Sequence, residues 1–239
     1  MFNLMLVAHL IGDYLLQFDF IARWKARSIL GVIAHGGIVT VVSLVCAALV
    51  DPSWWRYALL IGASHTVIDV ARARLIRAKN PTWDLILYLL DQIVHVTIIA
   101  LVVQMSGGSA QAHQDALARW ANPKVLAFAI GYLLLLQPGW VLLRFIVRGL
   151  WGSEAAPHLG AGEKFEPMLE RVLIASLVFG GQYYLVPLVL LPRRLESIRV
   201  QGNSVGMMVR LTAHWAETFL SVMLAVGVGL ALRMMTGGH

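Results

Sequence analysis

The sequence is poor in charge and nearly free of cysteine. Asp, Glu, Lys and Arg make up 13% of the 239 residues, whereas an ordinary soluble domain has about 25%. The single cysteine, Cys46, lies in an apolar run, which excludes a disulfide framework and a CxxC metal or redox site. No run of Lys and Arg interleaved with aromatic residues is present, so the net charge of +6 does not indicate a nucleic-acid partner. The first residues lack the basic region and cleavage site of a signal peptide, so we expect them to remain in the mature protein.

Hydrophobic residues dominate what is present. They make up 59% of the chain, and the mean hydropathy is +0.73. Because a transmembrane helix takes about 20 apolar residues, the sequence predicts an all-α fold, a polytopic transmembrane bundle of about six or seven helices. The apolar segments are residues 2–18, 29–50, 56–76, 83–104, 124–147, 168–191 and 210–236. Basic residues gather between these segments, as the positive-inside rule expects of cytoplasmic loops, which predicts a multi-pass protein surrounded by membrane lipids.

The pattern of breakers and charges predicts the organisation of the chain. We expect an N-terminal unit of four helices over residues 1–105, a polar loop over 106–123 and further transmembrane helices over 124–239. Alternating crossings place the first basic clusters in the cytoplasm, but the arginines of 193–210 then fall outside. Two repairs are open: residues 168–191 form a re-entrant hairpin at Gly180-Gly181, or the polar first segment does not fully span the membrane.

Ionisable side chains lie deep in the first four apolar segments, where they are costly and usually functional. Three of these segments pair a histidine with an aspartate four residues away, which places both side chains on one helix face. The candidates are His9 with Asp13, His65 with Asp69, Asp91 with His95, and His35 alone on the second segment. One such pair is a weak signal of function, whereas three pairs on the first four segments are hard to obtain by chance.

These residue types point to a metal centre. Imidazole and carboxylate are good ligands for Zn, Mn and Fe(II), and helix bundles build metal sites from side chains on facing helices. We therefore predict that all seven residues are candidate ligands of a divalent metal, with zinc first and Mn or Fe as alternatives. They suit either one catalytic ion with His–Asp hydrogen bonds around it or two ions about 3.5–4 Å apart.

The same residues carry a family resemblance. Four stretches carry it: His9-Leu-Ile-Gly-Asp13-Tyr14-Leu-Leu-Gln17, the lone His35, Ser64-His65 with Asp69, and Asp91-Gln92 with His95. The chain thereby resembles a family of bacterial integral membrane proteins catalogued as a domain of unknown function. That family carries the motifs HLxGDYxLQ, a lone His, SHxxxD and DQxxH. In the second half, Glu170-Arg171 and Glu217 look like the family's pattern. The resemblance implies a location in the bacterial inner membrane. The His/Asp arrangement is also similar to membrane-bound metal-dependent hydrolases, which implies hydrolysis of a lipid-borne bond.

The leading functional hypothesis is a metal-dependent hydrolase that acts on a lipid or lipid-linked substrate. Asp13 or Asp91, if not engaged by the metal, would act as general base. Five polar residues near the ligands are candidates for substrate binding, with Arg72 suited to an anionic headgroup or phosphate; they are Tyr14, Gln17, Ser64, Arg72 and Gln92. For each of these five, an interhelical hydrogen bond or a role in topology is the alternative.

Two other classes of function remain open. A transporter or channel for a divalent cation or protons would use the same ligands as a transit site, and a homodimer could supply its second half. A structural or accessory protein would use the His–Asp pairs only to hold the bundle together. His214 and Glu217, three residues apart in the last segment, suit either a second polar shell or an interfacial salt bridge.

Overall fold

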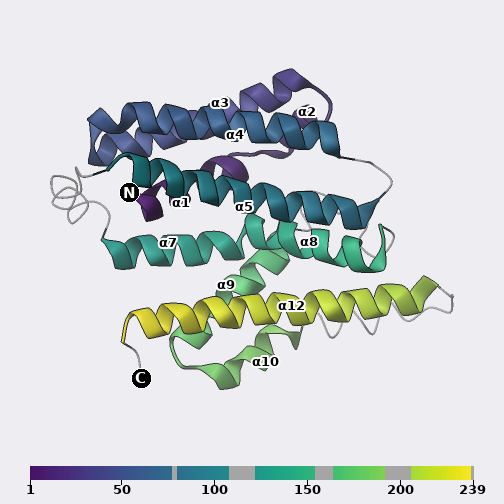
Figure 1. Ribbon diagram of the computed structural model, residues 1–239. Helices are drawn as coiled ribbons and strands as arrows, with labels where there is room; N and C mark the ends of the chain where they lie inside the picture. Colours follow the sequence, from purple (N-terminus) through teal and green to yellow (C-terminus); the bar gives the residue numbers. More distant parts are fainter. Residues whose placement is uncertain (77–79, 108–121, 154–163, 192–205, 238–239) are drawn as a thin grey trace. The chain divides into compact units, whose positions relative to one another are not determined.

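The computed structural model describes residues 1–76, 80–107, 122–153, 164–191 and 206–237, without the side chains of 206–210. Within these residues the regular structure is entirely helical (Figure 1). The chain forms two compact units, Met1–Arg77 with Ile86–Leu133, and Ala78–Leu85 with Leu134–His239. Most of the polar loop predicted at 106–123, and the arginines predicted outside the membrane at 193–199, lie outside the described residues.

Unit 1 is built from the predicted first four apolar segments and the start of the fifth. Its elements are α1 (Phe2–Leu10), the π-helical turn η1 (Ile11–Leu15), α2 (Asp19–Lys25), α3 (Ile29–Val50), the 3-10 turn η2 (Pro52–Trp54), α4 (Trp55–Leu75), most of α5 (Pro81–Met105) and most of α7 (Pro123–Leu135). Residues from α1, α3, α4, α5 and α7 share one apolar core.

Several helices have the length and composition of membrane spans. Three qualify alone, Ile29–Val50, Pro81–Met105 and Leu211–Met235, and two bent helix pairs raise the total to five. The all-α fold, the apolar membrane-type helices and a polar His/Asp cluster are therefore confirmed. Helix α4 is long enough, but its last turns carry Asp69, Arg72 and Arg74, and it is not among these candidates.

The first apolar segment does not continue straight through residue 18. Helix α1 widens into η1, which ends at Leu15, and the chain then bends by 87° into α2. Phe18, immediately before α2, has the extended backbone of an N-cap residue, with φ −58° and ψ 155°. As a result α2 turns back towards the helices that follow, and it packs against α3.

Close contact between α3 and α4 sets the position of two predicted ligands. A Cβ atom on Gly36 would overlap the side chain of Thr66, and one on Gly62 would overlap that of Thr40. Each threonine hydroxyl donates to a glycine carbonyl of its own helix, Thr40 to Gly36 at 2.7 Å and Thr66 to Gly62 at 2.9 Å. This small-residue packing brings together the helix faces that carry the histidines of α3 and α4.

Unit 2 consists of α8 (Gln137–Trp151), α9 (Phe165–Phe179), the turn η4 (Tyr183–Leu185), α10 (Val186–Val189) and α12 (Gly206–Met235), with the adjoining end residues of α5 and α7. The predicted segment 168–191 is not one helix. It breaks at Gly180-Gly181, where Gly181 has φ +75° and packs against the Arg233 guanidinium. This is a conformation and a contact that a side chain would disturb.

Arg171 is buried where α7 gives way to α8. Its Nε donates to the carbonyl of Leu135 at 2.7 Å, and its Nη2 to that of Leu136 at 3.3 Å. A third nitrogen, Nη1, lies 3.4 Å from the hydroxyl of Ser221 on α12. The guanidinium thus binds the Leu135 carbonyl, which lies at the end of α7 where helical carbonyls lose their intrahelical partners. It is a second donor to the Leu136 carbonyl, which also accepts from the Trp140 N–H at 3.1 Å. These contacts give Arg171 a structural role in unit 2.

Candidate metal centre

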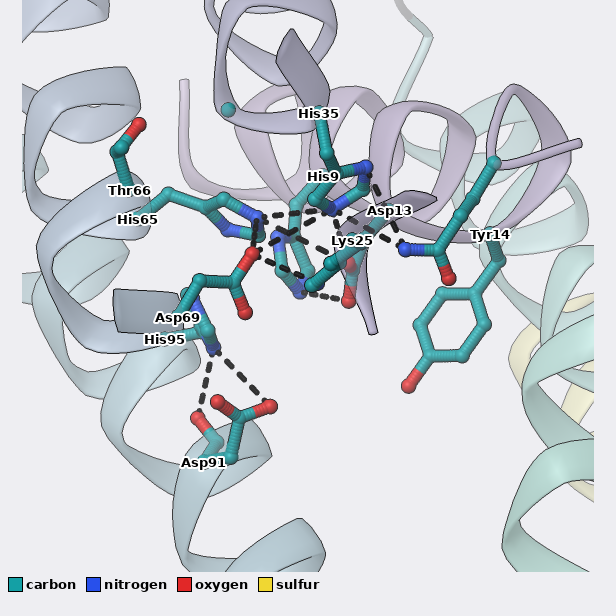
Figure 2. A network of polar contacts seen from close by, with 12 residues as sticks. His9, Asp13, Tyr14, Lys25, His35, His65, Thr66, Asp69, Asp91 and His95 are labelled. Atoms are coloured by element: carbon teal, nitrogen blue, oxygen red, sulfur yellow. Dashed lines mark hydrogen bonds and ion pairs between the residues drawn. The ribbon is translucent and has the colours of Figure 1, made fainter. Parts of the chain in front are cut away.

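The structure brings the seven predicted ligands of unit 1 into one buried cluster (Figure 2). They come from α1 (His9), η1 (Asp13), α3 (His35), α4 (His65 and Asp69) and α5 (Asp91 and His95). The most exposed of them, Asp13, has 7% of its surface accessible. Residues nearly ninety positions apart in the sequence thus meet at one point within the helices.

His65 lies at the centre of the four imidazole rings. Its ring centroid is 4.2 Å from that of His95, 5.3 Å from that of His35 and 5.4 Å from that of His9. The rings of His9 and His95 stack with centroids 5.1 Å apart. Four imidazoles at these separations cannot all be protonated without strong mutual repulsion.

Two groups of three residues have ligand atoms close enough to share an ion. The first group is Asp13, His35 and His65, and the second is His65, Asp69 and His95. In each group the ligand atoms lie within 4.8 Å of one another. Because both groups contain His65, they are overlapping positions in one centre.

His95 is oriented as a metal-binding histidine is. Its Nδ1 lies 2.8 Å from the backbone carbonyl oxygen of Asp91. A carbonyl oxygen only accepts, so Nδ1 carries the hydrogen, and in the neutral ring Nε2 keeps its lone pair. That Nε2 is buried and has no hydrogen-bond partner among the described residues. Histidine ligands typically donate their second nitrogen to a carbonyl or carboxylate in this way, which fixes the tautomer.

Other atoms of the cluster are also buried without a hydrogen-bond partner in the described part of the chain. They include Nε2 of His9 and Oδ1 of Asp91. Leaving a polar atom buried and unpaired costs about 1–3 kcal/mol, and burying a bare carboxylate costs more. A divalent cation would satisfy nitrogen and carboxylate donors together, so the donor set fits a metal ion chemically.

His35 is held differently from His95. Its Nε2 lies 2.9 Å from Oδ1 of Asp13, and its Nδ1 lies 3.4 Å from the side-chain nitrogen of Gln17. With the Gln17 amide donating to Nδ1, His35 Nε2 carries the hydrogen and donates it to Asp13. In this protonation state His35 positions the Asp13 carboxylate. To bind a metal ion through Nε2, it would first have to lose the hydrogen on that atom.

Four of the five residues predicted to bind substrate lie beside the cluster. The amide nitrogen of Gln92 is 3.0 Å from Asp91 Oδ2 and 3.4 Å from Asp13 Oδ2. Nη1 of Arg72 is 3.9 Å from Asp91 Oδ2. Gln17 reaches His35, as described above. The fourth, Tyr14, places its hydroxyl 2.9 Å from that of Tyr88.

Ser64 is the exception among these five. Its hydroxyl donates to the carbonyl of Leu60, one turn earlier on the same helix, at 2.7 Å. Because Ser64 precedes His65, its side chain starts about 100° away around α4. The structure thus places Ser64 on the surface of α4, away from the cluster.

Two residues of the site escaped the sequence analysis. Lys25, a basic residue after the first apolar segment, places its ammonium 2.7 Å from Asp69 Oδ2 (Figure 2). Tyr88 lies one turn before Asp91, and the Arg72 guanidinium stacks 5.8 Å above its ring. The spacing of Tyr88 and Asp91 was a signal available in the sequence. No such signal existed for Lys25, because the bend before α2 brings it to the cluster.

The comparisons with known proteins place the cluster in a known family. Residues 1–123 match the family described as "Protein of unknown function (DUF3307)", and the chain belongs to this family. The matched range contains all seven residues of the cluster, together with Lys25 and Tyr88. The comparisons with curated proteins and with solved structures gave no match.

Proposed function

We propose that this member of a family of unknown function binds a divalent transition-metal ion at the His/Asp cluster and uses it to hydrolyse a bond in a lipid or lipid-linked substrate. One observation carries the proposal that a metal binds here. His95 has its Nδ1 fixed on a backbone carbonyl, and its Nε2 is left buried and unpaired. The centroid of its ring lies 4.2 Å from that of a second imidazole, His65. A purely structural histidine would gain by pairing that nitrogen.

The second ligand group best suits the ion. His65, Asp69 and His95 offer two imidazole nitrogens and one carboxylate oxygen, which is a donor set typical of catalytic zinc sites that keep a position for water. Manganese and iron(II) accept the same ligands. His9, whose Nε2 is also unpaired, is a further nitrogen donor beside this group, because its ring stacks on that of His95.

The residues around this group have distinct tasks in hydrolysis. A bound divalent ion supplies activation of water and polarisation of the bond to be cleaved. Asp91 is the better general base of the two aspartates predicted, because its Oδ1 is unpaired while Gln92 holds its Oδ2 at 3.0 Å. Asp13 has His35 on one oxygen and Gln92 near the other, so it is occupied in positioning.

The surroundings of the site support a lipid substrate. Helices α3 and α5, which carry His35, Asp91 and His95, are apolar enough to span a membrane. Their outward-facing residues are exposed and hydrophobic, among them Ile33 at 52% and Ile93 at 61%. A substrate with an acyl or isoprenoid tail would therefore have an apolar environment next to the centre.

Elemental analysis tests the metal. Detergent-purified wild type should contain a divalent transition metal in a stoichiometric amount, and the double variant His65→Ala/Asp91→Ala should contain none. Ser64→Ala is the matched control, since its hydroxyl bonds only its own helix, and it should retain the metal. Wild type without bound metal would contradict the proposal and favour a structural role for the cluster.

Turnover tests the hydrolysis. Lipid extracts incubated with the metal-loaded protein should yield a product that EDTA abolishes. Asp91→Asn should keep the metal but lower kcat by a factor of about 10²–10⁴, the usual contribution of general acid–base catalysis. Metal without any product, combined with cation flux in proteoliposomes, would replace the hydrolase by a transporter that uses the same ligands.

A further inference from the structure

Lys25 competes for a carboxylate that the metal needs. It is the last residue of α2, and its ammonium lies 2.7 Å from Asp69 Oδ2 (Figure 2). The same oxygen lies 3.3 Å from His65 Nε2, inside the second ligand group. A divalent ion held by this group would need the oxygen that now accepts from Lys25, and two cations would repel strongly at such a distance. Metal binding would therefore release the ammonium.

The net charge of the centre indicates which kind of ligand it would bind beside the metal. Asp13, Asp69 and Asp91 supply three negative charges, and Lys25 and Arg72 supply two positive ones. With neutral imidazoles the metal-free centre carries a net charge of minus one. One divalent ion turns this into a net charge of plus one. Excess positive charge is costly at a buried site, so the loaded centre favours an anion.

The element that carries Lys25 has the composition of a membrane interface. Phe18, just before α2, is 55% exposed, and Phe20 and Trp24 within it are 60% and 42% exposed. The same short helix also carries Arg23 and Lys25. Exposed aromatic rings next to basic side chains are typical of the headgroup layer. The 87° bend after η1 is the turn that such a helix needs to lie along the membrane surface.

Arg72 approaches the cluster on the same end of the antiparallel helices α3 and α4. It lies in the last turn of α4, and the chain enters α3 at Ile29, four residues after Lys25. The Arg72 Nη1 is 3.9 Å from Asp91 Oδ2, and the side chain is 20% exposed, against 16% for that of Lys25. Both cations are thus partly accessible at one end of the centre.

We propose that Lys25 and Arg72 form a phosphate-binding subsite of the metal centre, which becomes available when the metal takes Asp69 from Lys25. A phosphate group supplies the anionic oxygens that both side chains bind well, and the headgroup of a phosphate-bearing lipid presents it at the depth of α2. The inference rests on the proposed function and names the substrate class of that site. A lipid phosphomonoester and free phosphate share this chemistry.

Lysine labelling of the intact wild-type protein tests the release. The sequence contains only four lysines, Lys25, Lys79, Lys124 and Lys164, so mass spectrometry resolves each one after treatment with an amine-reactive reagent in phosphatidylcholine nanodiscs. Stoichiometric Zn²⁺ should raise the labelling rate of Lys25 several-fold over protein kept in EDTA. Lys124, which is exposed at the start of α7, is the internal reference and should not change.

A second arm tests the phosphate. Adding phosphatidic acid to the nanodiscs of the Zn²⁺-loaded protein should slow Lys25 labelling again, while pure phosphatidylcholine should not. Protection by inorganic phosphate at a similar concentration would identify free phosphate as the ligand, and protection by phosphatidic acid alone would identify the lipid headgroup. Arg72→Gln should weaken the protection, whereas Arg56→Gln, on the opposite end of α4, should leave it unchanged.

The two proposals fail in different ways. If Zn²⁺ binds stoichiometrically and the labelling of Lys25 stays unchanged, the inference is overturned and the metal site stands. If release occurs but neither phosphate source protects Lys25, the phosphate subsite is overturned. If no metal binds, the proposed function fails together with the inference. As an independent check, Lys25→Met should bind Zn²⁺ more tightly than wild type, because a competing cation has been removed, and should lose the response to phosphate.

Discussion

His65 connects every part of the candidate centre. It is the residue common to both ligand groups, its ring is the nearest neighbour of the His95 ring at 4.2 Å, and its Nε2 lies 3.3 Å from both Asp69 Oδ2 and His35 Nε2. His35, in contrast, donates to Asp13. The two histidines therefore have different roles, although both are buried and both lie on helices of the same unit.

Substitution separates these roles. His65→Ala removes a donor from both ligand groups, so we expect no stoichiometric metal. His35→Ala removes a residue whose Nε2 lies 3.3 Å from that of the ligand His65, so we expect the metal affinity to fall by a factor of about 10–100, as is usual for residues that orient ligands. Competition titration with a chelating dye measures both, with Ser64→Ala as the neutral control. Equal losses for the two histidines would mean that His35 is itself a ligand.

At the scale of elements, the contact between α3 and α4 places the histidines. Gly36 and Thr66 pack against each other, as do Gly62 and Thr40, so the helices approach more closely than larger side chains would permit. Gly37, the next residue on α3, has nothing within 4 Å of a Cβ position. The chain thus offers two adjacent glycines of which only one is needed for the contact.

Alanine at these two positions should have opposite effects. Gly36→Ala forces the helices apart, and overpacking of this kind costs about 1–3 kcal/mol, so we expect a lower unfolding temperature and weaker metal binding. Gly37→Ala should leave metal binding unchanged and stabilise the helix by about 0.5–1 kcal/mol. Thermal unfolding in detergent and a metal titration check both. A Gly36→Ala protein as stable as wild type would show that Thr66 can turn away.

In unit 2 the break between α7 and α8 depends on one side chain. Arg171→Met keeps most of the volume but leaves the carbonyl of Leu135 without the donor it now has, while that of Leu136 keeps the Trp140 N–H. An unpaired buried acceptor costs about 1–3 kcal/mol, so we expect a marked loss of thermal stability in detergent. Arg171→Lys, which keeps a charged donor, should recover part of it. Unchanged stability in Arg171→Met would show that water replaces the guanidinium.

At the scale of the whole molecule, the metal links folding to ligand concentration. The free cluster holds three carboxylates and several unpaired atoms within buried surroundings, and an ion that binds only the folded state stabilises it. Zn²⁺ at 100 times its Kd should raise the free energy of unfolding by about 2.7 kcal/mol. Thermal scans with Zn²⁺ and with EDTA measure this shift. His65→Ala should show no shift, and a shift of equal size in that variant would place the ion elsewhere.

Much of the centre was predictable because its signals are local. Low charge and long apolar runs identify membrane helices, and the period of the helix puts His9 with Asp13, His65 with Asp69 and Asp91 with His95 on common faces without any tertiary information. The chemistry of imidazole and carboxylate then predicts a metal. None of these steps depends on how the helices pack.

Other features were decided only when the chain folded. A helical period fixes the face of a side chain but not its partner on another element, so the sequence left open that His35 holds Asp13 and that Tyr88 meets Tyr14. The bend before α2 carries Lys25 from a basic cluster to Asp69. The low charge of the chain therefore acquires its meaning from long-range packing, because five of its charged side chains are gathered at one point, where a metal ion and an anion can balance them. They are Asp13, Lys25, Asp69, Arg72 and Asp91.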